Sequence, residues 1–152
     1  MKVVVVSGGF DPIHSGHISL LKEASSLGDH LIVGINSDEW LERKKGYVFM
    51  PYEEREEIIQ SIQYVQGIIK FNDDDDSACD LLEQVKEYYS ECNIVFANGG
   101  DRNQSNNREL KVKGVEFVYG IGGDDKKNSS SRIVEKFLNK WNSTELVENV
   151  RL

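Results

Sequence analysis

Short apolar runs alternate with longer amphipathic stretches along most of the chain. Residues 2–7 (KVVVVS) form a continuous β-branched run, which is typical of a parallel strand covered on both faces. Further apolar runs predict strands at 31–35, 66–71, 93–97 and 115–119. Apolar positions at helical spacing predict helices over 15–27, 37–44, 52–64, 78–89 and 129–141. Ser15 is the expected N-cap of the first helix, and Gly28 is its expected stop.

Strands that alternate with helices require crossover connections, which are right-handed in nearly all known cases. The alternation therefore predicts an α/β fold, with a doubly wound, Rossmann-like and mostly parallel five-stranded sheet that carries helices on both faces. One domain is expected over residues 1–141, followed by a tail at 142–152 that is either frayed or docked on a partner subunit. Ligands of such sheets bind beyond the carboxyl ends of the strands, so we expect the site in the loops after the first, fourth and fifth strands.

The composition narrows the function classes. The chain carries 26 acidic and 18 basic residues, a net charge of -8, which disfavours nucleic acid as a partner. No apolar run approaches the roughly 20 residues of a membrane span, and the N-terminal run is too short for a signal peptide, so a cytoplasmic protein without membrane contact is expected. Cys79 and Cys92 lack the spacing of a disulfide framework or a zinc site, and we expect reduced thiols.

The most informative segment is the loop after the first strand, residues 8–17 (GGFDPIHSGH). Its paired glycines let the backbone approach a ligand closely, and the following helix offers unpaired amides and a positive dipole end to an anion. His14 and His17 lie at the start of this helix, and both can donate hydrogen bonds to a bound phosphate. The glycine spacing fits neither the dinucleotide-binding fingerprint nor the P-loop.

Other interpretations of these segments stay open. The two histidines can bind zinc, although no neighbouring residue completes a tetrahedral set, or they can cap the helix. The four aspartates at 73–76 favour the N-terminus of the helix that follows them. A metal site is the alternative there, although the spacing of a calcium-binding loop is absent.

The segment GGFDPIHSGH resembles the G-x-F-D-x-x-H-x-G-H signature of the cytidylyltransferase-like nucleotidyltransferases. The resemblance extends over about residues 1–140, and four further segments are similar to elements of the same family in the same order. These segments are LGDHLIVGINSD at 27–38, KKG at 44–46 with ER at 54–55, NGGD at 98–101 and SSSRI at 129–133.

The resemblance implies transfer of AMP or CMP from ATP or CTP to a small phosphorylated acceptor, a sugar or polyol phosphate, with release of pyrophosphate. It also implies Mg²⁺ as cofactor and a homodimer, in which the apolar residues of 46–55 would supply contact area. The alternative is a non-catalytic nucleotide-binding regulatory module of the same fold. An enzyme that hydrolyses or ligates through adenylation is a third interpretation.

The resemblance also assigns roles to individual residues. The catalytic residues would be His14, His17, Lys44, Lys45 and Ser130. The nucleotide-binding residues would be Gly8, Gly9, Phe10, Asp11, Gly16, Gly99, Gly100, Asp101, Ser129 and Ser131. Arg55 and Lys127 would contact the acceptor or a second subunit, and no metal ligand is assigned. Plainer alternatives are a solvated patch for the lysines, charge balance among glutamates for Arg55, a turn for residues 98–100 and a helix cap for the serines.

Two branches of the family are similar to this chain. The G-G-D at 99–101 is similar to the adenylyltransferases that act on heptose 1-phosphate. The cytidylyltransferases that act on glycerol 3-phosphate carry an R-x-x-G-I-S-T-T block, and Asp124 stands at the position of its arginine. Lys126 or Lys127 could replace that charge with a different geometry. The sequence therefore leaves the choice between ATP and CTP open.

Overall fold

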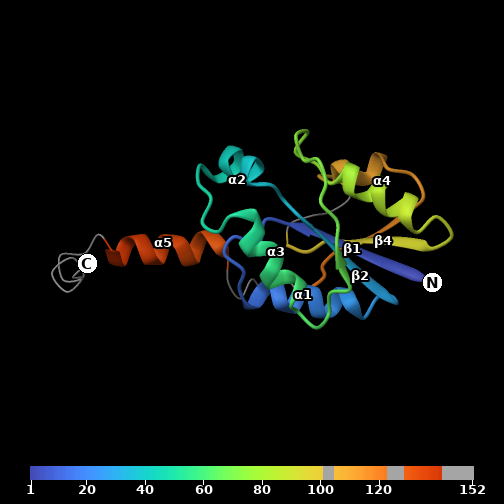
Figure 1. Ribbon diagram of the computed structural model, residues 1–152, viewed down its shortest axis with the longest axis horizontal. Coiled ribbons are helices and arrows are strands. Elements are labelled where there is room, and N and C mark those ends of the chain that lie inside the picture. The colour runs from blue at the N-terminus through green and yellow to red at the C-terminus, as the bar shows by residue number, and fades with distance from the viewer. Residues whose placement is uncertain (101–104, 123–128, 142–152) are drawn as a thin grey trace.

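The computed structural model describes residues 1–100, 105–122 and 129–141. The described elements follow the order β1 (Lys2–Gly8), α1 (Ser15–Ser25), β2 (His30–Ile35), α2 (Asp38–Lys45), α3 (Tyr52–Gln60), β3 (Gly67–Ile68), α4 (Cys79–Tyr88), β4 (Asn93–Ala97), the 3-10 helix η1 (Arg108–Lys111), β5 (Val115–Val118) and α5 (Ser130–Trp141) (Figure 1).

All strand pairs of the described sheet are parallel, and the strand order is β3-β2-β1-β4-β5. This confirms the predicted doubly wound, Rossmann-like α/β fold. The order reverses between β1 and β4, because β2 and β3 lie on one side of β1 whereas β4 and β5 lie on the other. The loops after β1 and β4 therefore diverge at the switch point, where such folds bind ligands.

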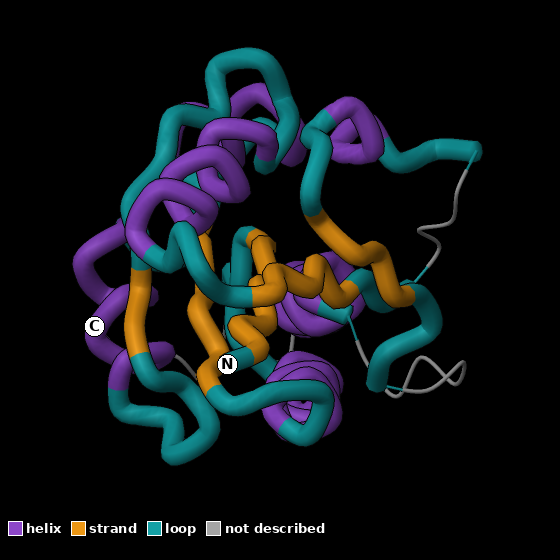
Figure 2. The backbone as a smooth tube through the Cα atoms, turned by 90° about the vertical axis from the view of Figure 1, so that its right-hand side faces the viewer, coloured by secondary structure: helices purple, strands orange, loops and turns teal. Residues whose placement is uncertain are grey.

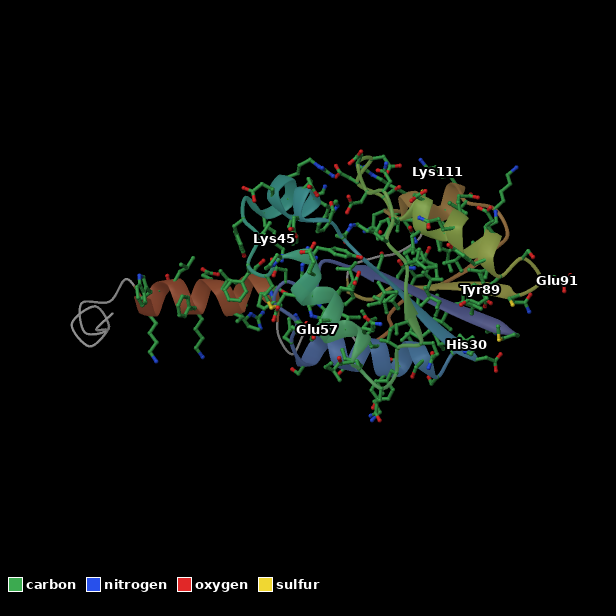
Figure 3. All side chains as sticks on the ribbon, in the orientation of Figure 1. His30, Lys45, Glu57, Tyr89, Glu91 and Lys111 are labelled. Atoms are coloured by element: carbon green, nitrogen blue, oxygen red, sulfur yellow. The ribbon has the colours of Figure 1, made fainter. Side chains whose placement is uncertain are left out.

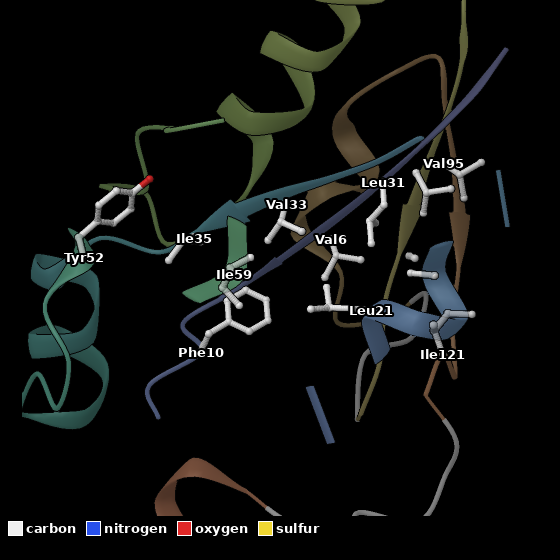
Figure 4. Packing of buried hydrophobic residues seen from close by; sticks show 13 residues of the cluster. Val6, Phe10, Leu21, Leu31, Val33, Ile35, Tyr52, Ile59, Val95 and Ile121 are labelled. Carbon is white, nitrogen blue, oxygen red and sulfur yellow. The ribbon is translucent and has the colours of Figure 1, made fainter. Parts of the chain in front are cut away.

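The sheet separates two apolar cores, and Figure 2 shows helices on both of its sides. Successive residues of β1 alternate between them: Val4 and Val6 belong to the first core, and Val3 and Val5 to the second. The first core includes residues of α1 and α3 (Figure 4), and the second includes the buried face of α4. Both faces of the central strand are thus covered, which explains its uninterrupted run of valines.

Some boundaries differ from the predicted ones. The helix predicted over 52–64 ends at Gln60, and the following residues continue as turns in which the Ile62 amide bonds to Ile59 and the Val65 amide to Ile62. Ile62 and Val65 pack against the first core from these turns. Their spacing in the sequence is also that of a helix face, which is why the sequence predicted a longer helix. The strand predicted at 66–71 is shortened to Gly67–Ile68 at the edge of the sheet. No helix in the described part of the chain is long and apolar enough to cross a membrane.

The second core predicts a stability difference within α4. Leu82 is fully buried, whereas Tyr88 on the same helix is 73% exposed. We expect Leu82→Ala to lower the free energy of unfolding by about 2–5 kcal/mol, because it leaves a cavity in a packed interior. Tyr88→Ala should change it by less than about 0.5 kcal/mol. Urea unfolding followed by circular dichroism measures both, and equal effects of the two substitutions would contradict this packing.

Candidate active site

The two histidines of the loop after β1 are held at the start of α1 by hydrogen bonds to backbone amides and by stacking of their rings. His14 is the N-cap, a position that the sequence assigned to Ser15. Its Nδ1 accepts a hydrogen bond from the Gly16 amide at 3.0 Å, and the Nδ1 of His17 accepts one from the His14 amide at 3.2 Å. The rings stack with their centroids 3.9 Å apart. Because both Nδ1 atoms accept, this bonding pattern assigns the hydrogen of each neutral ring to Nε2.

His17 is neutral at physiological pH. Its pKa is lowered from 6.5 to about 3, mainly by burial, and electrostatic interactions with His14 and Lys45 contribute in the same direction. Phe10 stands edge-on to its ring at 4.9 Å. His17 therefore suits the role of a fixed Nε2–H donor at pH 7 rather than that of a cation, and the helix-cap alternative is part of the arrangement that orients it.

The side chains of two residues of the loop point into the protein, and their assignment to nucleotide binding stays a prediction. Phe10 is 2% exposed and packs in the first core. Asp11 is fully buried, and its two carboxylate oxygens accept the amides of Phe49 at 2.7 Å and Met50 at 2.6 Å. Both oxygens are engaged by backbone of the same chain, so Asp11 fastens residues 46–51 to the histidine loop.

Arg55 is buried at the meeting point of three loops. It donates to the carbonyls of Gly9 at 2.8 Å, Asn36 at 2.7 Å and Met50 at 2.8 Å. Its guanidinium also pairs with Asp38 at 2.6 Å. The side chain is 1% exposed, and all of these partners belong to its own chain. Its contact with an acceptor or a second subunit therefore stays a prediction. Arg55 positions the loops that follow β1 and β2.

The structure separates the two adjacent lysines at the end of α2. Lys45 Nζ lies 3.3 Å from the Asp11 carbonyl oxygen, within the histidine loop, and Figure 3 labels this residue. Burial lowers the pKa of Lys45, and the neighbouring Asp11 charge partly opposes that shift. Lys44 Nζ lies 3.6 Å from Asp76 Oδ2, on the loop before α4. Of the pair, Lys45 is therefore the candidate for contact with phosphate.

The start of α5 lies beside the same loop. The Ser130 hydroxyl, 8% exposed, donates to the Pro12 carbonyl at 2.6 Å and so attaches α5 to the histidine loop. Its catalytic role stays a prediction. The Ser129 hydroxyl accepts the Arg132 amide at 3.1 Å, which is the contact of a helix cap. Ser131 is exposed on the first turn of α5. Asp101 and Lys127 lie outside the described residues.

The glycines of the site allow close packing of the loops. The Gly8 carbonyl accepts the Asn36 amide at 2.8 Å. A Cβ on Gly9 would lie 3.0 Å from the Leu41 side chain, and one on Gly99 would lie 2.8 Å from the Ile121 carbonyl oxygen. Gly100 has a positive φ of 62°. Gly99 requires glycine because its backbone approaches another segment of the chain, and Gly100 favours glycine because of its positive φ.

Hydrogen bonds that the sequence did not predict join the loop before α4 to residues 36–37, which follow β2. Asp73, 2% exposed, accepts the Ser37 hydroxyl at 2.7 Å, the Ser37 amide at 2.8 Å and the Asn36 side-chain amide at 3.1 Å. The sequence allowed two interpretations of the aspartates at 73–76, a helix N-terminus or a metal site. The structure shows that Asp73 is buried and bonded to the segment after β2. In the described part of the chain, no three His, Cys, Asp or Glu residues are grouped so that they could hold a metal ion.

With this geometry in view, comparison with known proteins places the chain in a family. Residues 5–148 match the cytidylyltransferase-like family. The chain belongs to that family, which confirms the resemblance noted in its motifs.

The relatives that match include proteins named as bifunctional and one named as a cytidylyltransferase. The bifunctional protein HldE of Alcanivorax borkumensis is 32% identical over 152 residues, which are 99% of this chain and 28% of that protein. The glycerol-3-phosphate cytidylyltransferase of Bacillus subtilis is 38% identical over 102 residues, 66% of this chain and 73% of that enzyme. The chain thus spans about 28% of the length of the HldE relatives that it matches.

Solved structures share the fold. A lipopolysaccharide core biosynthesis protein from Thermoplasma volcanium superposes with a TM-score of 0.61 at 27% identity, over 82% of this chain and 99% of that one. The nicotinic acid mononucleotide adenylyltransferase of Plasmodium falciparum superposes with a TM-score of 0.53 at 16% identity, over 97% of this chain and 89% of that one. The second likeness concerns the fold alone.

The buried position of Arg55 predicts a large loss of stability on its removal. Arg55→Ala should lower the free energy of unfolding by about 3–5 kcal/mol, because it leaves buried carbonyls without donors and breaks an ion pair. Arg55→Lys should not restore stability, since an ammonium lacks the planar set of donors. The exposed Gln60→Ala on the same helix is the control, with a change below about 0.5 kcal/mol. Urea unfolding decides, and a wild-type midpoint for Arg55→Ala would refute the positioning role.

The lowered pKa of His17 predicts a pH dependence of stability. The unfolded chain binds a proton at His17 near pH 6.5, whereas the folded chain does so only near pH 3. Stability that depends on a neutral His17 is therefore complete above pH 6.5 and is lost as the pH falls toward 3. Thermal unfolding between pH 7.5 and 4.5 should show a steeper decline for wild type than for His17→Gln. Parallel profiles would mean that His17 is not buried in its neutral form.

Proposed function

We propose that the protein is a nucleotidyltransferase that transfers AMP or CMP from ATP or CTP to a small phosphorylated acceptor, a sugar or polyol phosphate, with release of pyrophosphate. The observation that carries this proposal is the locked histidine pair at the N-terminus of α1, with Lys45 beside it. Backbone amides fix both rings in the form that carries a hydrogen on Nε2. A helix N-terminus and a lysine add positive potential at the same loop.

This arrangement suits an in-line displacement at the α-phosphorus. A phosphate oxygen of the acceptor forms the new P–O bond, the bond from the α-phosphorus to the bridging oxygen breaks, and pyrophosphate leaves with the electron pair. The acceptor phosphate is already largely ionised near neutral pH, so no strong general base is needed. The residues of the site would mainly bring two anions together and stabilise the negative charge that develops on the phosphoryl oxygens.

We propose Mg²⁺ as the counterion of the triphosphate. Mg²⁺ in nucleotide sites is held by phosphate oxygens, waters and one or two carboxylates. The Asp11 carboxylate is engaged by two backbone amides, so it does not fit that role. Among the described residues, no group of three His, Cys, Asp or Glu could hold the ion, and we assign it no step of the reaction.

Both nucleotides remain within the proposal. The name of the Bacillus subtilis relative supports a cytidylyl transfer to a polyol phosphate, whereas the G-G-D segment at 99–101 supports an adenylyl transfer to a sugar phosphate. We also propose a homodimer as the functional form.

The test is pyrophosphate release from purified protein with Mg²⁺, using ATP or CTP, each with and without a panel of sugar and polyol phosphates. The proposal expects release with one nucleotide only when an acceptor is present. Binding of nucleotide without release under any combination would instead support the regulatory module.

The two adjacent lysines supply a matched pair of variants for this assay. Lys45→Ala should lower kcat/KM by about 10²–10³-fold, as is typical when a group that stabilises phosphoryl charge is removed. Lys44→Ala should retain activity within about threefold, because its ammonium pairs with Asp76 away from the histidines. Equal losses in the two variants would contradict the site as described.

A further inference from the structure

Helix α2 carries Lys45 but has little apolar packing of its own. It contains eight residues, a length at which an isolated helix is marginal in water. All residues of α2 are described, and Leu41 is the buried one among them. Figure 1 shows α2 at the edge of the fold. The place and the rotation of this helix therefore depend on polar contacts at its two ends.

Asp73 holds the start of α2. Its carboxylate accepts the amide of Ser37 at 2.8 Å and the hydroxyl of Ser37 at 2.7 Å, and Ser37 is the N-cap of the helix. The Ser37 hydroxyl in turn accepts the Trp40 amide at 3.1 Å. Asp73 is buried, and hydrogen bonds to a charged group are stronger away from water. Asp73 thus fixes the point at which α2 begins.

The same loop also holds the end of α2. Arg43 donates to the Asp73 carbonyl at 2.9 Å and pairs with the Asp76 carboxylate at 3.2 Å. The other oxygen of that carboxylate lies 3.6 Å from Lys44 Nζ. Asp76 has a positive φ of 62°, a conformation that is uncommon for residues other than glycine and that persists where surrounding contacts hold it. The loop at 73–76 is therefore bonded to both ends of one short helix.

Pairing with Asp76 also sets the rotation of α2. Successive residues of a helix are turned by roughly 100° about its axis. With Lys44 turned to Asp76, Lys45 is directed to another side, where its Nζ lies 3.3 Å from the Asp11 carbonyl oxygen in the histidine loop. The chain after Lys45 is held separately, because the Asp11 carboxylate accepts the amides of residues 49–50. Lys45 is therefore fixed by contacts on both sides of it in the sequence.

The loop that supplies the two aspartates is attached to the body of the protein. Arg108 donates to the Asp75 carbonyl at 3.4 Å, and the buried Glu109 accepts the Ala78 amide at 2.9 Å. Both of these residues belong to η1, which lies between β4 and β5 in the chain. Within the loop, the Asp75 carboxylate accepts the amide and the hydroxyl of Ser77. The loop therefore forms a fixed support for α2.

We propose that Asp73 and Asp76 are positioning residues, which hold α2 at its two ends and so direct Lys45 to the histidine loop. Both act through Lys45 and not by contact with a phosphate, since a carboxylate repels an anion. The proposal gives the first and last aspartates of the run a role that the sequence could not assign. The positioning of Lys45 for catalysis rests on the proposed function, whereas the holding of α2 does not.

The aspartate run offers matched variants, because each Asp→Asn substitution in it removes the same charge. Asp76 pairs with α2, whereas Asp74 is exposed and serves as the control. Asparagine tolerates the positive φ at position 76, so Asp76→Asn removes the charge without changing the backbone. Loss of a negative charge near an anion site should by itself favour anion binding. A loss of activity in Asp76→Asn would therefore report a displaced Lys45.

The first test measures whether the aspartates hold α2, independently of any activity. By hydrogen exchange and mass spectrometry, the amides of α2 should exchange at least about fivefold faster in Asp73→Asn and in Asp76→Asn than in wild type, because the helix opens more easily. Asp74→Asn should match wild type, and unchanged exchange in β1 shows that each variant folds. If the buried Asp73→Asn does not fold, Asp76→Asn decides. Equal exchange of α2 in wild type and Asp76→Asn would overturn the proposal.

The second test asks whether Asp76 acts through Lys45. Asp76→Asn should lower kcat/KM for pyrophosphate release by about tenfold, because a small displacement of a group that contacts phosphate slows the reaction strongly. Asp74→Asn should stay within about twofold of wild type. In a chain that already carries Lys45→Ala, Asp76→Asn should have almost no further effect. Equal losses with and without Lys45 would mean a merely structural role and would overturn the proposal.

The two tests also separate this proposal from the proposed function. If no nucleotide and acceptor give any pyrophosphate release, the proposed function fails, and hydrogen exchange still decides whether the loop holds α2. Faster exchange of α2 with unchanged kcat/KM in Asp76→Asn would overturn the positioning role and leave the proposed function intact. Because Arg43 keeps both of its bonds when Lys44 is removed, Lys44→Ala should leave α2 in place.

Discussion

The arrangement of the site depends on the buried guanidinium of Arg55. Its donors satisfy the Gly9, Asn36 and Met50 carbonyls, which come from three loops that would otherwise leave buried acceptors unpaired. A buried carbonyl without a donor costs about 1–3 kcal/mol, so these loops are held together only while the guanidinium is in place. The buried Asp11 carboxylate accepts two backbone amides of residues 46–51. The Arg55 guanidinium and the Asp11 carboxylate together fix the backbone around the histidines.

The hydrogen bonds that cap α1 also orient the two histidines as hydrogen-bond donors. His14 and His17 each use Nδ1 to accept a backbone amide, which is ordinary stabilisation of a helix start. The same bonds fix which nitrogen carries the hydrogen. Burial then keeps His17 neutral. A rigid, neutral donor costs little reorganisation when charge develops on a phosphate, and this is the property that electrostatic catalysis requires.

The apolar residues that stabilise the fold lie on the two faces of the sheet, whereas the polar residues of the site lie at the carboxyl ends of its strands. The two cores on its faces come from alternating residues of the strands and need only apolar side chains at the right period. The polar residues gather at the carboxyl ends of the strands, where Asp73 bonds to Ser37 and Ser130 bonds to Pro12. The first bond joins the loop before α4 to the start of α2, and the second joins the start of α5 to the histidine loop. Substitutions in the cores should therefore affect stability first, and those at the loops should affect the site first.

The sequence by itself determined the parallel α/β fold, the histidine loop and the family, because strand runs, helical periodicity and a short motif are local patterns. Only the tertiary structure decided which members of the motif face inward. The Phe49 amide that engages Asp11 is 38 residues away from it, and the Gly9 carbonyl that engages Arg55 is 46 residues away. Neighbours such as Lys44 and Lys45 were equivalent in the sequence and are separate in space. Burial and pairing depend on contacts between distant segments, and no local pattern specifies them.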